Sequence, residues 1–143
     1  MTRIGAALIW AALVGLPPVA AMAEARRTVV VLSFAPNAAN PERLDQLSAA
    51  ATALRAAADD PTARIWIEAR FDDQRLEDAR EAGIAPLRLR AIHQAGRDLA
   101  LRRAAAARAA LLGIAGPEIA DRVRIELRAG EAPEARVRIE AAE

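Results

Sequence analysis

The segment RIWIEARF, residues 64–71, alternates strictly between apolar and polar side chains. Successive side chains of a β-strand point to opposite faces of a sheet, so the pattern predicts a strand with one buried face. The segments 121–127 and 136–140 repeat this alternation, and Ile125 is among the side chains expected to point inward. The β-branched run TVVVLSF, residues 28–34, predicts a further, more deeply buried strand. The chain is therefore expected to build a sheet of four strands.

Helical patterns fill the spaces between the first three strands. Asn40-Pro41-Glu42 supplies an N-cap, a proline for the first turn and an early acid, and apolar residues then recur at helical spacing up to Asp59. The segment 98–112 consists of strong helix formers and is expected to end at Gly113. Residues of about 73–96 form a polar insert with helical character. The predicted fold is α+β, a βαβαββ two-layer sandwich with this helical insert before the second core helix.

The N-terminus has the pattern of an export signal. Arg3 precedes an uncharged run, Pro17-Pro18 breaks it, and Ala21-Met22-Ala23 provides small residues at a cleavage site. We expect residues 1–23 to be a signal peptide cleaved after Ala23, which leaves a domain of residues 24–143 in the periplasm. The alternative is an uncleaved membrane anchor, because the uncharged run approaches the length of about 20 residues that spans a bilayer. After cleavage, no membrane span is expected.

The charge balance argues against a nucleic-acid partner. The whole chain has 20 basic residues, all arginine, and 19 acidic residues. Loss of Arg3 with the signal peptide leaves a formal net charge of zero, and few aromatic residues are present for base stacking. Without cysteine and with His93 as its only histidine, the chain has few candidate metal ligands and no thiol nucleophile. We expect no metal, no cofactor, no catalytic residue and no enzymatic activity.

Three sequence segments suggest a family. IWIEARFD places Asp72 at the end of a strand, GRDLALRRA follows on a helix, and ARVRI closes the chain. From about Thr28 to Glu140 the chain resembles the OmpA-like C-terminal, peptidoglycan-associated domain. That family has an Asp after its second strand and N-x-x-L-S-x-x-R-A on the next helix. The positions that correspond to N, L, S, R and A are occupied here by Gly96, Leu99, Ala100, Arg103 and Ala104.

The resemblance implies a ligand and a ligand site. In the family, the Asp and the Arg hold meso-diaminopimelate of the peptidoglycan stem peptide. It therefore implies that Asp72 and Arg103, with Leu99 beside them, bind peptidoglycan. A carboxylate and a guanidinium suit this ligand because it carries both ammonium and carboxylate groups. The resemblance also implies a non-catalytic binding module of the cell envelope, near the outer membrane, with envelope proteins as further candidate partners.

Alternatives remain for each of these residues. Asp72 could instead end its strand or cap the following helix, and Arg103 could be a solvated arginine paired with Asp98 or Asp72. Several polar family positions hold other residues here, including Phe71 in place of Thr and Gly96 in place of Asn. The alternative function is a structural or protein-interaction domain of the same fold that has lost peptidoglycan binding, with the 73–96 insert as its partner surface.

Overall fold

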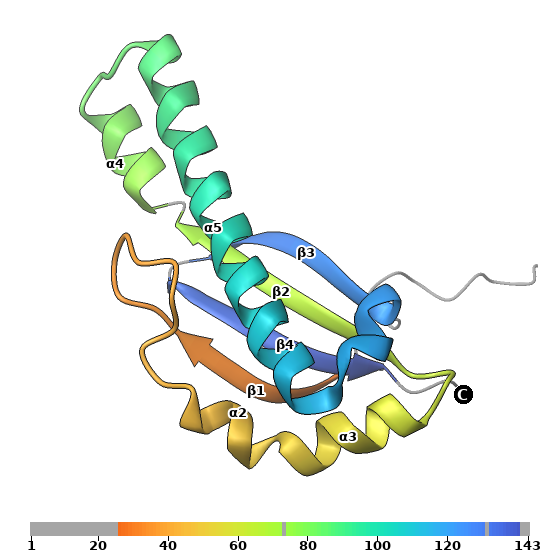
Figure 1. Ribbon diagram of the computed structural model, residues 1–143. Coiled ribbons are helices and arrows are strands. Elements are labelled where there is room, and N and C mark those ends of the chain that lie inside the picture. Colours follow the sequence, from red (N-terminus) through yellow and green to blue (C-terminus); the bar gives the residue numbers. More distant parts are fainter. Residues whose placement is uncertain (1–25, 73, 131, 141–143) are drawn as a thin grey trace, which may run out of the picture.

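The structure, a computed structural model, describes residues 26–72, 74–130 and 132–140. It is an α+β fold, in which a four-stranded mixed sheet has helices packed on one face (Figure 1). In chain order the elements are β1 (Arg26–Ser33), α2 (Asp45–Ala49), α3 (Ala51–Asp59), β2 (Arg64–Asp72), α4 (Gln74–Glu81), α5 (Pro86–Ala115), the 3-10 helix η1 (Pro117–Arg122), β3 (Val123–Gly130) and β4 (Glu134–Glu140). The predicted α+β class and all four predicted strands are confirmed.

The four strands are ordered β1-β4-β2-β3, and three of them end at the same end of the sheet. Strand β4 is antiparallel to both β1 and β2, and β2 is parallel to β3. Strands β1, β2 and β3 consequently run in the same direction. Their last residues, Ser33, Asp72 and Gly130, therefore lie at the same end of the sheet.

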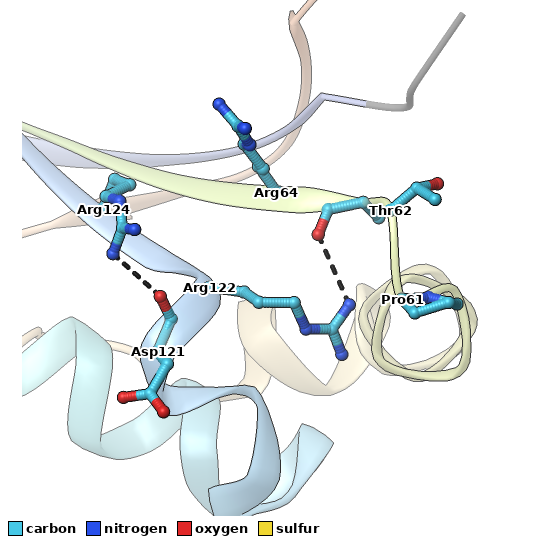
Figure 2. Close-up of a pocket in the computed structure, with 7 residues that line it drawn as sticks. Pro61, Thr62, Arg64, Asp121, Arg122 and Arg124 are labelled. Atoms are coloured by element: carbon cyan, nitrogen blue, oxygen red, sulfur yellow. Dashed lines mark hydrogen bonds between the residues drawn. The ribbon is translucent and has the colours of Figure 1, made fainter.

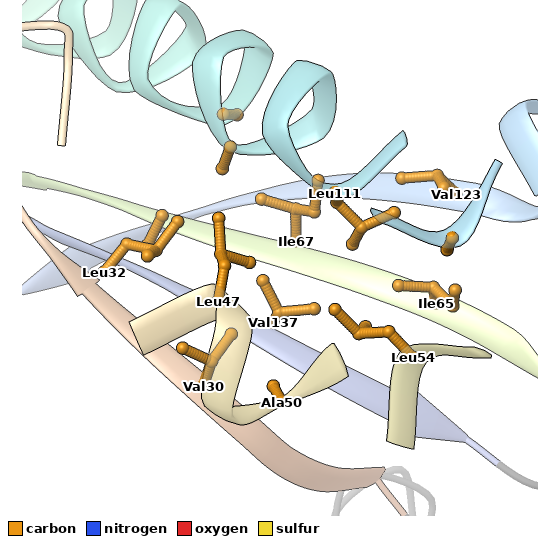
Figure 3. Close-up of a cluster of buried hydrophobic side chains, with 14 of the residues drawn as sticks. Val30, Leu32, Leu47, Ala50, Leu54, Ile65, Ile67, Leu111, Val123 and Val137 are labelled. Carbon is orange, nitrogen blue, oxygen red and sulfur yellow. The ribbon is translucent and has the colours of Figure 1, made fainter. Parts of the chain in front are cut away.

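The core lies between the sheet and helices α2, α3 and α5 (Figure 3). The buried face of α5 is mostly alanine, with Ala100, Ala104 and Ala107 fully buried. Small side chains let this helix lie close to the sheet, as its composition predicts. The largest fully buried side chains are Leu32, Leu47, Leu54, Ile65, Ile67, Leu111, Ile119 and Val137.

The face of the sheet opposite the helices is charged. Glu68, only 3% exposed, lies 3.2 Å from Arg138, 3.4 Å from Arg70 and 3.7 Å from Arg128. Trp66 lies on this face too, and its indole N–H donates to Glu140 at 2.6 Å. Ion pairs and arginine stems, rather than a second layer of helices, cover the central strands on this side.

Helix α5 differs most from the sequence prediction. It is a single helix of 30 residues that includes the second half of the predicted 73–96 insert, and Gly96 does not interrupt it. Together α4 and the first turns of α5 project beyond the sheet (Figure 1). Leu76 of α4 is buried at their contact. The helix passes the expected stop at Gly113 and ends before Gly116, whose φ of 96° favours glycine.

One further local prediction is wrong, and another is correct only for the direction of a side chain. No helix begins at Asn40, because Pro41 forms an isolated β-bridge with Phe34 and helix α2 starts only at Asp45. Ile125 lies on the helix side of β3, as predicted, but is 41% exposed. The reason is that α5 packs mainly on β2 and leaves the edge strand β3 partly uncovered.

The predicted signal peptide, residues 1–23, lies outside the described residues. Within the described ranges 26–72, 74–130 and 132–140, no helix combines the length and apolarity needed to cross a membrane.

Candidate functional site

The predicted ligand residues belong to two elements that meet at the carboxyl ends of β1, β2 and β3. Asp72 is the last residue of β2, and its backbone pairs with Gly130 of β3. Arg103 and Leu99 lie one turn apart on α5, the helix that packs most closely on β2. The structure describes the backbone of Asp72 and not its side chain, so its pairing with Arg103 stays a prediction.

Arg103 is buried, with only 3% of its surface exposed. Its Nε donates to the carbonyl oxygen of Ala38 at 2.9 Å, and an Nη donates to that of Ala35 at 3.3 Å. The guanidinium carbon lies 5.3 Å from the centre of the Phe34 ring. The alternative of a solvated helix arginine is therefore wrong. Arg103 holds the β1–α2 loop against α5, and each of these contacts uses its charge.

The β1–α2 loop is also held by its own backbone. Phe34 N–H donates to Pro133 in the β3–β4 turn at 3.0 Å, and Glu42 N–H donates to Ser33 at 3.0 Å. Asn37 has a φ of 63°, a left-handed conformation that asparagine tolerates better than most residues. The loop, whose exposed tip includes Asn37, is thus tied to the β3–β4 turn and to the end of β1.

The neighbours of Arg103 on α5 have different environments. Asp98, considered as a partner of Arg103, instead accepts from Gln94 at 2.8 Å. Arg102 is exposed, and Leu99 is half-buried. Leu99 therefore offers an apolar surface next to the buried guanidinium, while Arg102 provides a natural comparison for any experiment on Arg103.

An aromatic cluster at the base of the projecting helices was missed by the sequence reasoning. The rings of Phe71 and His93 meet edge to face with centroids 5.5 Å apart, and the guanidinium of Arg97 lies 5.8 Å from the Phe71 ring. His93 is thus a packing residue of α5. The spacing of His93 and Arg97, one helical turn apart, was a usable signal, but the sequence did not show that Phe71 faces them.

A second polar site lies at the opposite end of the sheet. A depression of about 460 Å³ is lined by Thr62, Arg64, Asp121, Arg122 and Arg124, together with Pro61 and Ala63 (Figure 2). The guanidinium of Arg122 points toward the end of α3 and donates to the carbonyl oxygens of Ala57, Ala58, Asp60 and Ala63. Helix ends leave such carbonyls without partners inside the helix, so Arg122 caps α3.

The remaining charges of this depression are mostly engaged with the backbone or with solvent. Arg124 donates to the carbonyl oxygen of Asp121 at 2.8 Å, and Arg64 points away from Arg122 (Figure 2). Hydrogen bonds from the Thr62 hydroxyl at 2.6 Å and the Thr62 N–H at 2.9 Å lower the pKa of Asp60. The arginine-rich lining of this depression thus has a clear structural role through Arg122.

Among the residues that the structure describes, no group of three or more His, Cys, Asp or Glu side chains could hold a metal ion. Comparison of the chain with models of protein families and with curated proteins finds no match.

Proposed function

We propose that this protein is a periplasmic, non-catalytic binding module with the OmpA-like βαβαββ fold, and that it recognises the peptidoglycan stem peptide. The observation that supports this most is the position of Arg103. Its guanidinium joins α5 to the β1–α2 loop at the same end of the sheet as Asp72. Two opposite charges, one at a strand end and one on the adjacent helix, suit a ligand that carries both an ammonium and a carboxylate.

In this proposal each residue has a distinct part. The Asp72 carboxylate accepts hydrogen bonds from the ammonium of diaminopimelate, and Arg103 donates to one of its carboxylates. Leu99 packs against the aliphatic part of the ligand. Because Arg103 is only 3% exposed, the ligand has to share its donors with the loop carbonyls of Ala35 and Ala38. Ligand binding should then change amide hydrogen exchange in the β1–α2 loop.

The test is co-sedimentation of the purified protein with peptidoglycan sacculi, with its N-terminus defined by mass spectrometry. Asp72→Asn removes a charge without changing the shape of the side chain, and it should abolish retention. Arg103→Lys should weaken retention because lysine cannot form a bidentate pair. Arg102→Ala, at an exposed neighbour, is the matched control and should be retained as the wild type is. Free meso-diaminopimelate should compete.

Circular dichroism and thermal unfolding of each variant separate loss of binding from loss of folding. Retention of Asp72→Asn at the wild-type level, with no competition by free diaminopimelate, would contradict the proposal.

The burial of Arg103 favours a second candidate, an interaction domain of the same fold without peptidoglycan binding. In that case Arg103 has a structural role and binds no ligand, and the projecting helices α4 and α5 contact a protein partner. Leu87, 76% exposed near the start of α5, is the anchor expected for such a contact. A photo-crosslinker at position 87, compared with one at exposed Arg55 on α3, tests this. A defined envelope-protein adduct at position 87 alone, together with unchanged retention of Asp72→Asn, would favour the second candidate.

A further inference from the structure

The two edges of the sheet are protected to different degrees. Strand β1 has a register shift between Thr28 and Val30 in its pairing with β4, and it begins with two consecutive arginines. Such irregularities and charges hinder pairing with another strand. Strand β3 has eight residues, no proline and an uninterrupted register with β2 from Val123 to Gly130. Among the described residues, no strand pairs with the outer edge of β3.

The outer edge of β3 also has an exposed apolar residue at its middle. Ile125 lies on the helix side of the sheet, opposite Ile67 of β2, yet it is 41% exposed. On the other face of the same strand, Arg124, Glu126 and Arg128 alternate with the apolar residues. A regular edge with an exposed apolar residue between unlike charges is suited to pairing with a strand of complementary pattern.

We propose that β3 pairs antiparallel with β3 of a second copy of this chain, with the two-fold axis at Ile125. In this register Ile125 faces its own copy, and Arg124 of each copy faces Glu126 of the other. Val123 likewise faces Leu127. The two sheets join into one continuous sheet that keeps all helices on the same side. Every opposing pair from Val123 to Leu127 is then either apolar with apolar or a cation with an anion.

Neighbouring registers are less favourable on the same grounds. An axis at Glu126 places Glu126 against Glu126 and Arg124 against Arg128, so both charged pairs repel. An axis at Leu127 places Ile125 against Ala129 and Glu126 against Arg128. Because Glu126 and Arg128 already form an ion pair at 3.0 Å within one chain, this register adds no new kind of charge pair. The axis at Ile125 combines burial of the exposed side chain with two new unlike pairs.

The register can be tested by reversing single charges on β3. Sedimentation velocity over a series of protein concentrations then measures the monomer–dimer equilibrium of each variant. The wild type should show a monomer–dimer equilibrium. Arg124→Glu and Glu126→Arg should each raise the dimer Kd at least about tenfold, because each creates two like-charge contacts across the axis. Arg27→Glu, the same charge change on the exposed opposite edge, is the control and should leave the Kd unchanged.

Mixing the two single variants gives the decisive measurement. In the mixed dimer, one copy has acids at both positions 124 and 126, and the other copy has arginines at both. Each acid then faces an arginine across the axis, so an equimolar mixture should dimerise although each variant alone does not. The double variant, Arg124→Glu with Glu126→Arg, should dimerise by itself. Glu126 also pairs with Arg26 at 3.1 Å within one chain, and rescue by mixing shows that its substitution has not simply unfolded the protein.

Three outcomes would overturn the proposal. One is a wild type that stays monomeric up to its solubility limit. Another is a mixture of the two single variants that stays monomeric. The last is an Arg124→Glu variant that dimerises as well as the wild type, which would exclude the axis at Ile125.

Discussion

Arg103 and Arg122 lie near opposite ends of the sheet and both donate to backbone carbonyl oxygens. Arg122 is partly exposed and reaches four carbonyls around the end of α3. Arg103 is 3% exposed and reaches two carbonyls in the β1–α2 loop while stacking over Phe34. Arg122 thus reaches more of the described backbone carbonyls, whereas Arg103 is more deeply buried.

These two environments show how to judge the contribution of an arginine to stability. Carbonyls that lose a partly exposed donor can be hydrated, whereas carbonyls that lose a buried donor are left unpaired. The number of contacts therefore overstates the contribution of Arg122 to stability. The contrast also shows why several arginines around a depression do not by themselves indicate an anion site, since Arg122 is committed to a helix end.

Arg103→Ala should have the largest effect on stability. It removes a buried side chain, its contact with Phe34 and the N–H groups that donate to the carbonyl oxygens of Ala35 and Ala38. We expect a loss of about 3 kcal/mol in the free energy of unfolding. Urea unfolding followed by circular dichroism measures this loss. Arg102→Ala, its exposed neighbour, should cost less than about 0.5 kcal/mol. A loss of similar size in both variants would show that burial does not set the contribution of Arg103.

Arg122→Ala should have a smaller effect, about 2 kcal/mol, although Arg122 donates to four described backbone carbonyls. Water can reach the end of α3 and bind some of the carbonyls that Arg122 leaves. Hydrogen exchange should increase locally at the end of α3, while the β1–α2 loop remains unchanged. Arg64→Ala, which removes an exposed arginine of the same depression that points away from Arg122 (Figure 2), is the control. If Arg122→Ala lowers the free energy of unfolding more than Arg103→Ala does, then the number of carbonyl partners matters more for stability than burial.

Much of this fold could be predicted from the sequence because its strands are amphipathic. The alternation in 64–71 and 136–140 identified the buried faces of β2 and β4 correctly, since a period of two is a direct consequence of strand geometry. Ile125 shows where this reasoning stops. Alternation places it on the helix side of β3, but its exposure depends on how far α5 extends across the sheet, which is a property of packing.

The helix boundaries were less predictable because tertiary contacts override local signals. Asn40 and Pro41 have the residue types of a helix start, yet Pro41 pairs with Phe34 and the loop is held by Arg103. Gly96 has the residue type of a helix interruption, yet α5 continues through it. A single glycine costs a helix only about 1 kcal/mol, which packing of the flanking turns can offset.

The candidate site was predictable in part. The sequence pointed to Arg103, and the structure gives that residue an unusual environment. Its burial and its loop partners could not be predicted, because Ala35 and Ala38 take part through carbonyl groups that every residue has. The capping role of Arg122 was missed for the same reason.

The smallest expected effect concerns Asp60, whose carbonyl accepts from Arg122 and whose side chain accepts from Thr62. The pKa of Asp60 is lowered mainly by the side-chain hydrogen bond from Thr62, then by the Thr62 N–H, and least by the charge of Arg122. A carboxyl whose pKa is lower in the folded protein adds stability above its unfolded pKa, and this stability is lost as the pH falls through the folded pKa. Thr62→Val should therefore raise the pKa of Asp60 toward its ordinary value and make unfolding less sensitive to acid. NMR titration of the Asp60 carboxyl measures this shift. Arg122→Ala should move the same pKa less than Thr62→Val does; a larger shift in Arg122→Ala would mean that the charge of Arg122, and not only its hydrogen bonds to carbonyls, organises this end of the sheet.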